Sequence, residues 1–226
     1  MQGRLPPATF PRHLWGMFRR TFLGAAALAA LLIAPAAAQT AAAQPADAAA
    51  TLARVEAYLN GIRTIRARFL QVAQNGASAQ GTAWIWRPGR MRFDYDPPEP
   101  LLLVASGGQV MMYDRELRQP TTVPASATPL GVLLRPQIRL SGDITVTNVD
   151  RRGGFLHVTL HRTGQAAEGR LTLTFEENPL QLRQWTVLDA QGRETRVTLY
   201  EIDTTTQPSA RLFDFNDPRF FEQERR

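Results

Sequence analysis

Alternation of apolar and polar side chains predicts that most of this chain forms β-strands. Leu156, Val158 and Leu160 alternate with polar residues, and residues 171–175 alternate leucine or phenylalanine with threonine. A period of two places successive side chains on opposite faces of a strand. The strands predicted in this way are residues 66–72, 82–86, 90–95, 101–105, 109–114, 143–149, 154–161, 169–176, 180–188 and 193–201. Neither face of residues 180–189 is consistently apolar, which predicts either a β-bulge or burial of both faces there.

The stretch of residues 81–98, GTAWIWRPGRMRFDYDPP, is the most distinctive hairpin of the pattern. Within each strand, large apolar side chains are two residues apart and share a face, while arginine and aspartate fill the positions between Met91 and Tyr95. We expect one charged face and one face of large apolar groups, made by Trp84, Trp86, Met91, Phe93 and Tyr95. Arg87, before a proline, would place a charge at the rim of the apolar face.

Two segments have helical signals. Leu52, Val55, Leu59 and Ile62 follow helical spacing after Asp47, which can cap the helix. In residues 128–134, TPLGVLL, a capping threonine and a proline at the first position precede four apolar residues, and a proline at 136 ends the run. This short helix is either a plug in the core or a movable cover. Residues 119–127 are rich in proline, threonine and serine and are expected to be irregular.

Together these elements predict a mainly β fold with a few helices. About ten antiparallel strands in meander order would form an open, unclosed barrel or curved sheet, with a helical lid over its concave side. Such a sheet is too wide to be filled by its own side chains. A hollow lined by tryptophan, methionine, phenylalanine and leucine is a site for an apolar ligand.

The first 38 residues have the pattern of a cleaved signal peptide. Arg19 and Arg20 precede an apolar run in residues 22–33, and three alanines in residues 36–38 form a cleavage site. A membrane anchor is the alternative, but the run falls short of the ~20 residues that a span needs. We therefore expect a signal peptide in residues 1–38, a disordered lead in 39–46 and a single domain in 47–226. The general secretory route, the twin-arginine route and a start at Met17 all stay open.

Charge and cysteine content narrow the possible partners and the cellular compartment of the protein. All 26 basic residues are arginines, and four of them precede residue 39, so 22 remain against 20 acidic residues. This near balance gives no argument for nucleic acid. The chain has no cysteine, so it forms no disulfide and no thiolate metal site. Export without disulfides fits a periplasmic location.

Catalytic and metal-binding patterns are weak. His157 and His161 share a strand face but have no evident third metal ligand, and Asp94 and Asp96 are better explained as surface charges than as an acid–base pair. Neither a nucleophile elbow nor a phosphate-binding loop is present. These residues favour a binding protein over an enzyme, with no cofactor and no metal.

Several stretches then carry a resemblance. The initial helix, the W-I-W-R-P-G-R-M-R-F-D-Y hairpin, the S-G-G-Q-V-M-M-Y-D strand and the T-P-L-G-V-L-L helix resemble the LolA family of periplasmic lipoprotein carriers, over residues 48–215. The resemblance implies an open barrel under a helical lid, and a cavity for lipoprotein acyl chains. An inner-membrane ABC transporter complex would load this carrier, expected to be a monomer, for delivery to an outer-membrane acceptor. It also implies that Arg87 holds the lid shut and that Met91 lies at the transporter-facing rim, where the family usually has an aromatic residue.

A second hypothesis is an envelope sensor or a structural lipid- or peptide-binding module with the same fold. A hydrolase is a third, but it lacks a nucleophile constellation. A carrier should have a contiguous hollow, whereas in a module the same side chains should fill one another. The residues expected to line the hollow are Trp84, Trp86, Met91, Phe93, Tyr95, Met112, Leu130, Leu133 and Leu134.

Overall fold

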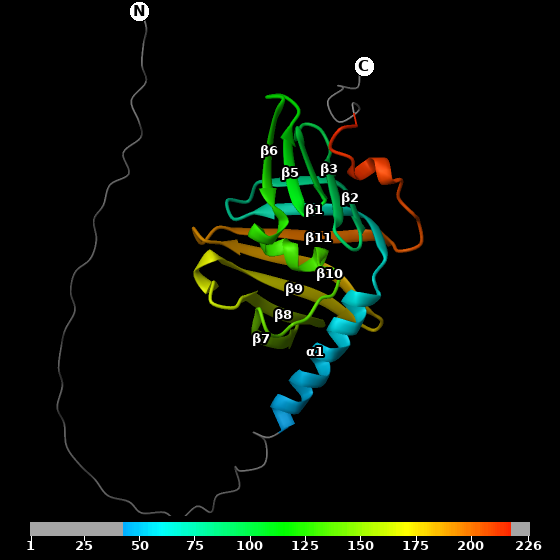
Figure 1. Ribbon diagram of the computed structural model, residues 1–226. Helices are drawn as coiled ribbons and strands as arrows, with labels where there is room; N and C mark the ends of the chain where they lie inside the picture. The colour runs from blue at the N-terminus through cyan, green and yellow to red at the C-terminus, as the bar shows by residue number, and fades with distance from the viewer. Residues whose placement is uncertain (1–42, 218–226) are drawn as a thin grey trace, which may run out of the picture. The chain divides into compact units, whose positions relative to one another are not determined.

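One antiparallel sheet of eleven strands dominates the computed structural model, which describes residues 43–217 (Figure 1). The strand order is β6-β5-β4-β3-β2-β1-β11-β10-β9-β8-β7, so two meanders are joined where β1 pairs with β11. The strands are β1 Thr64–Ala73, β2 Ser78–Trp86, β3 Arg90–Tyr95, β4 Leu101–Ser106, β5 Gln109–Asp114, β6 Gln119–Pro124, β7 Ile144–Arg152, β8 Phe155–Arg162, β9 Gly169–Glu177, β10 Leu180–Asp189 and β11 Glu194–Asp203. Since β6 and β7 end the order without pairing, the sheet is open, as the sequence predicted.

Helices cover one face of this sheet, which we call the inner face. On this face lie α1 (Ala43–Gly61) and the short 3₁₀ helices η1 (Ala125–Ala127) and η2 (Pro129–Leu134). Two further 3₁₀ helices are η3 (Ala166–Glu168), in the β8–β9 loop, and η4 (Ala210–Phe213), which packs on the opposite face. Val55 and Leu59 of α1, together with Val132 and Leu133 of η2, belong to the main hydrophobic core. The core therefore lies between the sheet and these two elements. None of the described helices is long and apolar enough to cross a membrane.

Three details of the secondary structure correct or confirm the sequence analysis. The first helix begins at Ala43, so Asp47 lies inside it and residues 43–46 are not an irregular lead. Ala43 and Ala46 favour a helix there, and Pro45 lies in the first turn, where the missing N–H of proline is tolerated. Residues 119–124 form β6 instead of an irregular segment, because backbone pairing with β5 outweighs their composition. The bulge predicted in residues 180–189 is confirmed between Leu182 and Gln184. The expected signal peptide lies outside the described residues.

The β2–β3 connection reverses one prediction. Three residues join the strands, so Trp86 pairs with Arg90, Trp84 with Arg92 and Ile85 with Met91. Directly paired residues share a face, and a shift of one residue transfers every side chain of a strand to the other face. Trp84 and Trp86 therefore lie on the charged face, opposite Met91. They cannot line a hollow on the inner face.

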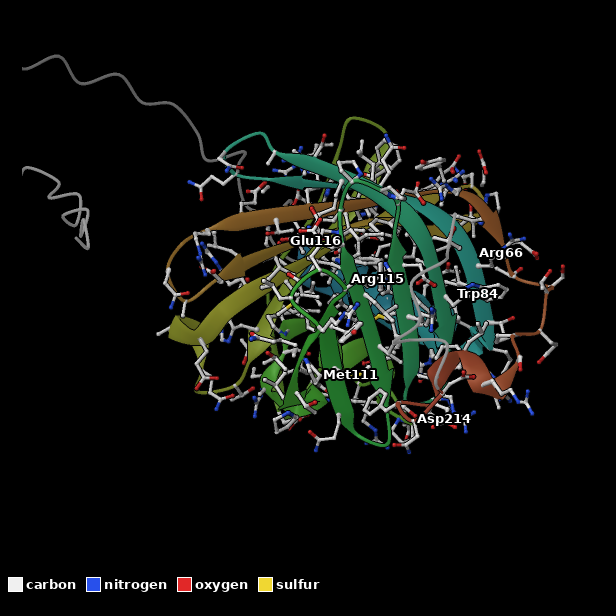
Figure 2. All side chains as sticks on the ribbon, turned by 90° about the horizontal axis from the view of Figure 1, so that it is seen from above. Arg66, Trp84, Met111, Arg115, Glu116 and Asp214 are labelled. Carbon is white, nitrogen blue, oxygen red and sulfur yellow. The ribbon has the colours of Figure 1, made fainter. Side chains whose placement is uncertain are left out.

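The outer face of β2–β5 carries a second apolar cluster instead. Its buried members are Leu102, Val104, Met111, Tyr113 and Phe213, against which both tryptophans pack. The C-terminal segment supplies Phe213, whose ring lies 5.8 Å from that of Trp86. Figure 2 labels Trp84 and Met111 on the strands and Asp214 in this segment. The tail that follows β11 thus covers the outer surface of the first meander.

Candidate ligand-binding site

A cavity of about 390 Å³ lies between the two 3₁₀ helices η1 and η2 and the loop end of the β8–β9 hairpin. Its volume is within the range of small-molecule sites, about 300–1,000 Å³. Apolar side chains from η2 and three strands line it, namely Val132, Leu134, Ile144, Leu160 and Leu171. Polar residues that line it are Ser126, Thr128, Arg135, His161, Arg162, Gln165 and Glu168. The cavity therefore combines an apolar lining with a polar one.

The residues predicted to line a hollow are mostly elsewhere. Leu134 alone among them lines this cavity in the described part of the chain. Met91, Phe93 and Leu133 are buried in the main core, with Tyr95 and Leu130 packed against it. Met112 is 46% exposed. Met91 and Phe93 thus form part of the close-packed core between the sheet and the helices. The cavity itself lies nearer β8 and β9.

Sequence reasoning missed most of the cavity. The alternation in β8 and β9 does predict that Leu160 and Leu171 share a face, since these two residues pair directly. The polar residues come from η1, from the residues directly after η1 and η2, from the end of β8 and from the β8–β9 loop with η3. Positions in these connections have no periodic signal. That these connections meet is a property of the folded sheet.

Arg87 is buried, with 7% of its surface exposed, at the end of β2. Its Nη2 donates to the carbonyl oxygen of Arg135 at 2.9 Å and lies 3.5 Å from Oδ1 of Asn60. Nε and Nη1 are buried without a partner among the described residues. Burial is the main cause that lowers the pKa of Arg87, and the charge of Arg63 lowers it further. The guanidinium is therefore a buried charge that is only partly compensated.

The carbonyl that Arg87 contacts belongs to what we call the lid segment, residues 125–140, which comprises η1, η2 and the loop that follows. We call residues 134–140 its held end. The amide of Gly89 donates to Leu134 O at 2.9 Å. Asn60 of α1 accepts from the amide of Ile138 at 2.8 Å and donates to its carbonyl at 2.9 Å. Glu56 accepts from the amide of Leu140 at 2.5 Å. The first helix and the β2–β3 connection thus hold this end together.

Residues 125–128, which we call the free end, have fewer ties to the rest of the protein. The amide of Ala125 donates to Gly108 O at 2.8 Å, and Nη1 of Arg162 donates to Ser126 O at 2.7 Å. Ser126 and Ala127 are exposed, and both line the cavity. The cavity thus adjoins the end of the lid segment that has the fewer contacts.

The two histidines of β8 do not build a metal centre with their neighbours. Nδ1 of His157 lies 3.0 Å from the hydroxyl of Thr174, and Nδ1 of His161 donates to Arg162 O at 2.8 Å. Within residues 43–217 there is no cluster of three or more histidine, cysteine or acidic side chains that could hold a metal ion. The chemistry that the site offers is burial of apolar surface beside hydrogen-bonding groups.

Comparison with known proteins agrees with the architecture. A family model described as "Outer membrane lipoprotein carrier protein LolA" matches residues 60–216. An outer-membrane lipoprotein carrier protein of Legionella pneumophila is 31% identical, over 73% of this chain and 85% of the relative. A protein of the same name from Methylococcus capsulatus is 28% identical, over 73% and 83%. An uncharacterized protein of Rickettsia prowazekii is 26% identical, over 77% and 81%. The chain belongs to the LolA family of outer-membrane lipoprotein carrier proteins.

Proposed function

We propose that this protein is a periplasmic carrier that binds the acyl chains of lipoproteins and moves them from the inner to the outer membrane. The observation that carries the proposal is the apolar cavity beside the lid segment. Burying an alkyl chain there removes apolar surface from water, at about 25 cal/mol per Å². Membership of a family named for carriage, with no catalytic constellation in the sequence, supports binding over catalysis.

The packing indicates how such a carrier would enlarge its site. Leu133 and Leu134 of η2 are buried in the same core as Met91 and Phe93 of β3. If the lid segment moves away from the sheet, these side chains expose a continuous apolar surface. The empty protein buries that surface with its own leucines, so closure and acyl binding compete. Arg87 stabilises the closed arrangement through Arg135 O.

The partners follow from the same role. An inner-membrane ABC transporter complex would load the carrier, and an outer-membrane acceptor, where one is present, would unload it. Met91, which the resemblance assigns to the transporter-facing rim, is only 2% exposed in this closed arrangement. Its contact with a transporter would thus require the lid segment to open. We expect the loaded carrier to be a monomer.

One observation favours a second candidate. Met91, Phe93 and Leu133 fill one another's space, which is the packing expected for a sensor or a structural lipid- or peptide-binding module of the same fold. A module of that kind would not open around an acyl chain. Acyl binding distinguishes the two.

Filling the cavity tests the proposal. Ala127 lines the cavity and is exposed, so Ala127→Trp adds bulk there with little cost to the fold. We expect it to weaken binding of a fluorescent N-acylated peptide about tenfold or more. Ala166→Trp is the matched control, because Ala166 is exposed and is not among the residues that line the cavity. Unchanged binding in Ala127→Trp would place the ligand elsewhere. Absence of acyl binding in the wild type would favour the module.

A further inference from the structure

Gln165 places an unpartnered acceptor at the cavity. It lies in the loop between β8 and β9, where its amide donates to Arg162 O at 2.9 Å and its carbonyl accepts from the amide of Glu168 at 3.0 Å. These two bonds fix the backbone of Gln165 in a turn. Its side chain lines the cavity, and Oε1 is buried without a hydrogen-bond partner in the part of the chain that the structure describes.

An acceptor in this position favours ligands that bring a donor. Buried polar groups in folded proteins nearly always have a partner, and leaving one unpaired is destabilising. The cavity below it is lined by Leu160 and Leu171, which offer no hydrogen bond. A ligand with an apolar chain and an N–H or O–H at its head satisfies both parts of the site.

The charged groups at the cavity are of both signs and do not form a dedicated anion site. The carboxylate-bearing Glu168 lines the same cavity. Of the two arginines there, Arg135 pairs with Asp143 at 2.7 Å and Arg162 donates to Ser126 O. Both cations therefore already have oxygen partners. A fatty-acid carboxylate would bring only acceptors to Oε1 of Gln165, and so would an ester.

We propose that Gln165 makes the cavity selective for acyl chains joined through an amide, whose N–H donates to Oε1. The alkyl chain then lies along the apolar lining and the amide lies at the loop. An ester of the same shape has an oxygen in place of the N–H, so it leaves the acceptor unpaired and adds a repulsive oxygen–oxygen contact. This inference rests on the proposed function, because it specifies which acyl linkage the same cavity takes.

Two isosteric probes test the linkage. N-dodecanoylglycine methyl ester and its analogue with the amide N–H replaced by oxygen differ in one group, and their affinities can be measured by displacement of a fluorescent fatty probe. We expect the wild-type protein to bind the amide about tenfold more tightly than the ester. Dodecanoate at pH 7 should bind more weakly than the amide. Equal affinity for amide and ester would overturn the selectivity and leave acyl carriage standing.

A substitution of Gln165 tests whether this residue causes the preference for the amide. Gln165→Met keeps the length of the side chain and removes the acceptor, so the preference for the amide should fall to about onefold. Gln137→Met is the matched control, because Gln137 is an exposed residue of the lid segment that is not among those lining the cavity. It should keep the preference. A preference that survives in Gln165→Met would overturn the assignment. If the wild type binds neither probe, the proposed function fails and this inference fails with it.

Discussion

The two ends of the lid segment are held in different ways. The held end, residues 134–140, is bonded to the β2–β3 connection through Gly89 and Arg87 and to α1 through Asn60 and Glu56. The free end, residues 125–128, is bonded to the β4–β5 turn and to one arginine of β8. The held end is also more deeply buried than the free end. Ile138 is 1% exposed, whereas Ser126 and Ala127 are exposed to solvent.

This difference indicates about which residues the lid segment would rotate when it opens. An opening motion breaks the contacts that cost least, and regions with few buried apolar contacts open most readily. The free end has these properties and adjoins the cavity. We therefore infer that the segment opens from residues 125–128 and turns about residues 134–140. The proposed role of Arg87 is then to determine how strongly residues 134–140 resist this rotation.

Truncation of one apolar side chain in the held end and of one in η2, next to the free end, tests the comparison most strongly. Ile138→Ala should lower the free energy of unfolding by about 2–5 kcal/mol, because it leaves a cavity in the core. Leu130→Ala, on the partly buried side of η2, should cost clearly less, about 1 kcal/mol. Urea unfolding measured by tryptophan fluorescence gives both values. Equal costs would mean that the two ends are equally fixed, and the pivot would be wrong.

Release of ligand tests the pivot itself. Arg87→Leu removes the bond to Arg135 O, so the closed state loses a contact with which acyl chains compete. Charged hydrogen bonds contribute about 1.5–3 kcal/mol, and the burial that lowers the pKa of Arg87 offsets part of this. We expect an acylated peptide to leave the variant up to about tenfold more slowly. Stopped-flow displacement measures the off-rate.

Arg63→Leu is the matched control for this change. Arg63 is exposed, and its carbonyl accepts from the amide of Arg87, which the substitution leaves in place. Because the charge of Arg63 also lowers the pKa of Arg87, its loss should slightly favour the charged form of Arg87. Release from this control should therefore be as fast as from the wild type or slightly faster. Faster or unchanged release from Arg87→Leu would show that the arginine is structural and does not favour release.

The fold was largely predictable from the sequence, because strand period and turn residues are local. The ten predicted strands, the bulge in β10 and the short helix after Thr128 all occur in the structure. The faces of Trp84 and Trp86 were predicted wrongly. Their orientation depends on the parity of a three-residue connection, which composition does not reveal. The aromatic pair therefore packs under the C-terminal segment and not over the cavity.

The site was predictable only in part, since it joins segments that are distant in the chain. The contact of Arg87 with the end of η2 has the geometry that the resemblance implies, but its functional role stays a prediction. Gln165 had no signal in the sequence. Its position at the cavity depends on the β8–β9 loop meeting the lid segment, and its importance depends on one acceptor left unpaired.

Lowering the pH also tests the difference between the two ends of the lid segment. Its expected effect is the smallest and the most local. Two ties of the held end use a carboxylate, Glu56 with the amide of Leu140 and Asp143 with Arg135. The hydrogen bond from Arg135, more than any other cause, lowers the pKa of Asp143 below its usual 3.8. A group with a lowered pKa in the folded state stabilises that state above its unfolded pKa, and the contribution is lost as pH falls through the lowered value. The contacts of the free end described above use an arginine and backbone groups and no carboxylate.

We therefore expect the held end to loosen below about pH 3.8 while the free end does not change. The Asp143 side chain is 68% exposed, so Asp143→Asn should cost only about 0.2–1 kcal/mol at pH 6 and nothing measurable well below the lowered pKa. Hydrogen exchange of residues 135–140, corrected for intrinsic rates, should show this difference, and Glu116→Gln, an exposed carboxylate elsewhere, should not. If acid accelerates exchange equally in residues 125–128, the two ends share one opening motion and the pivot does not exist.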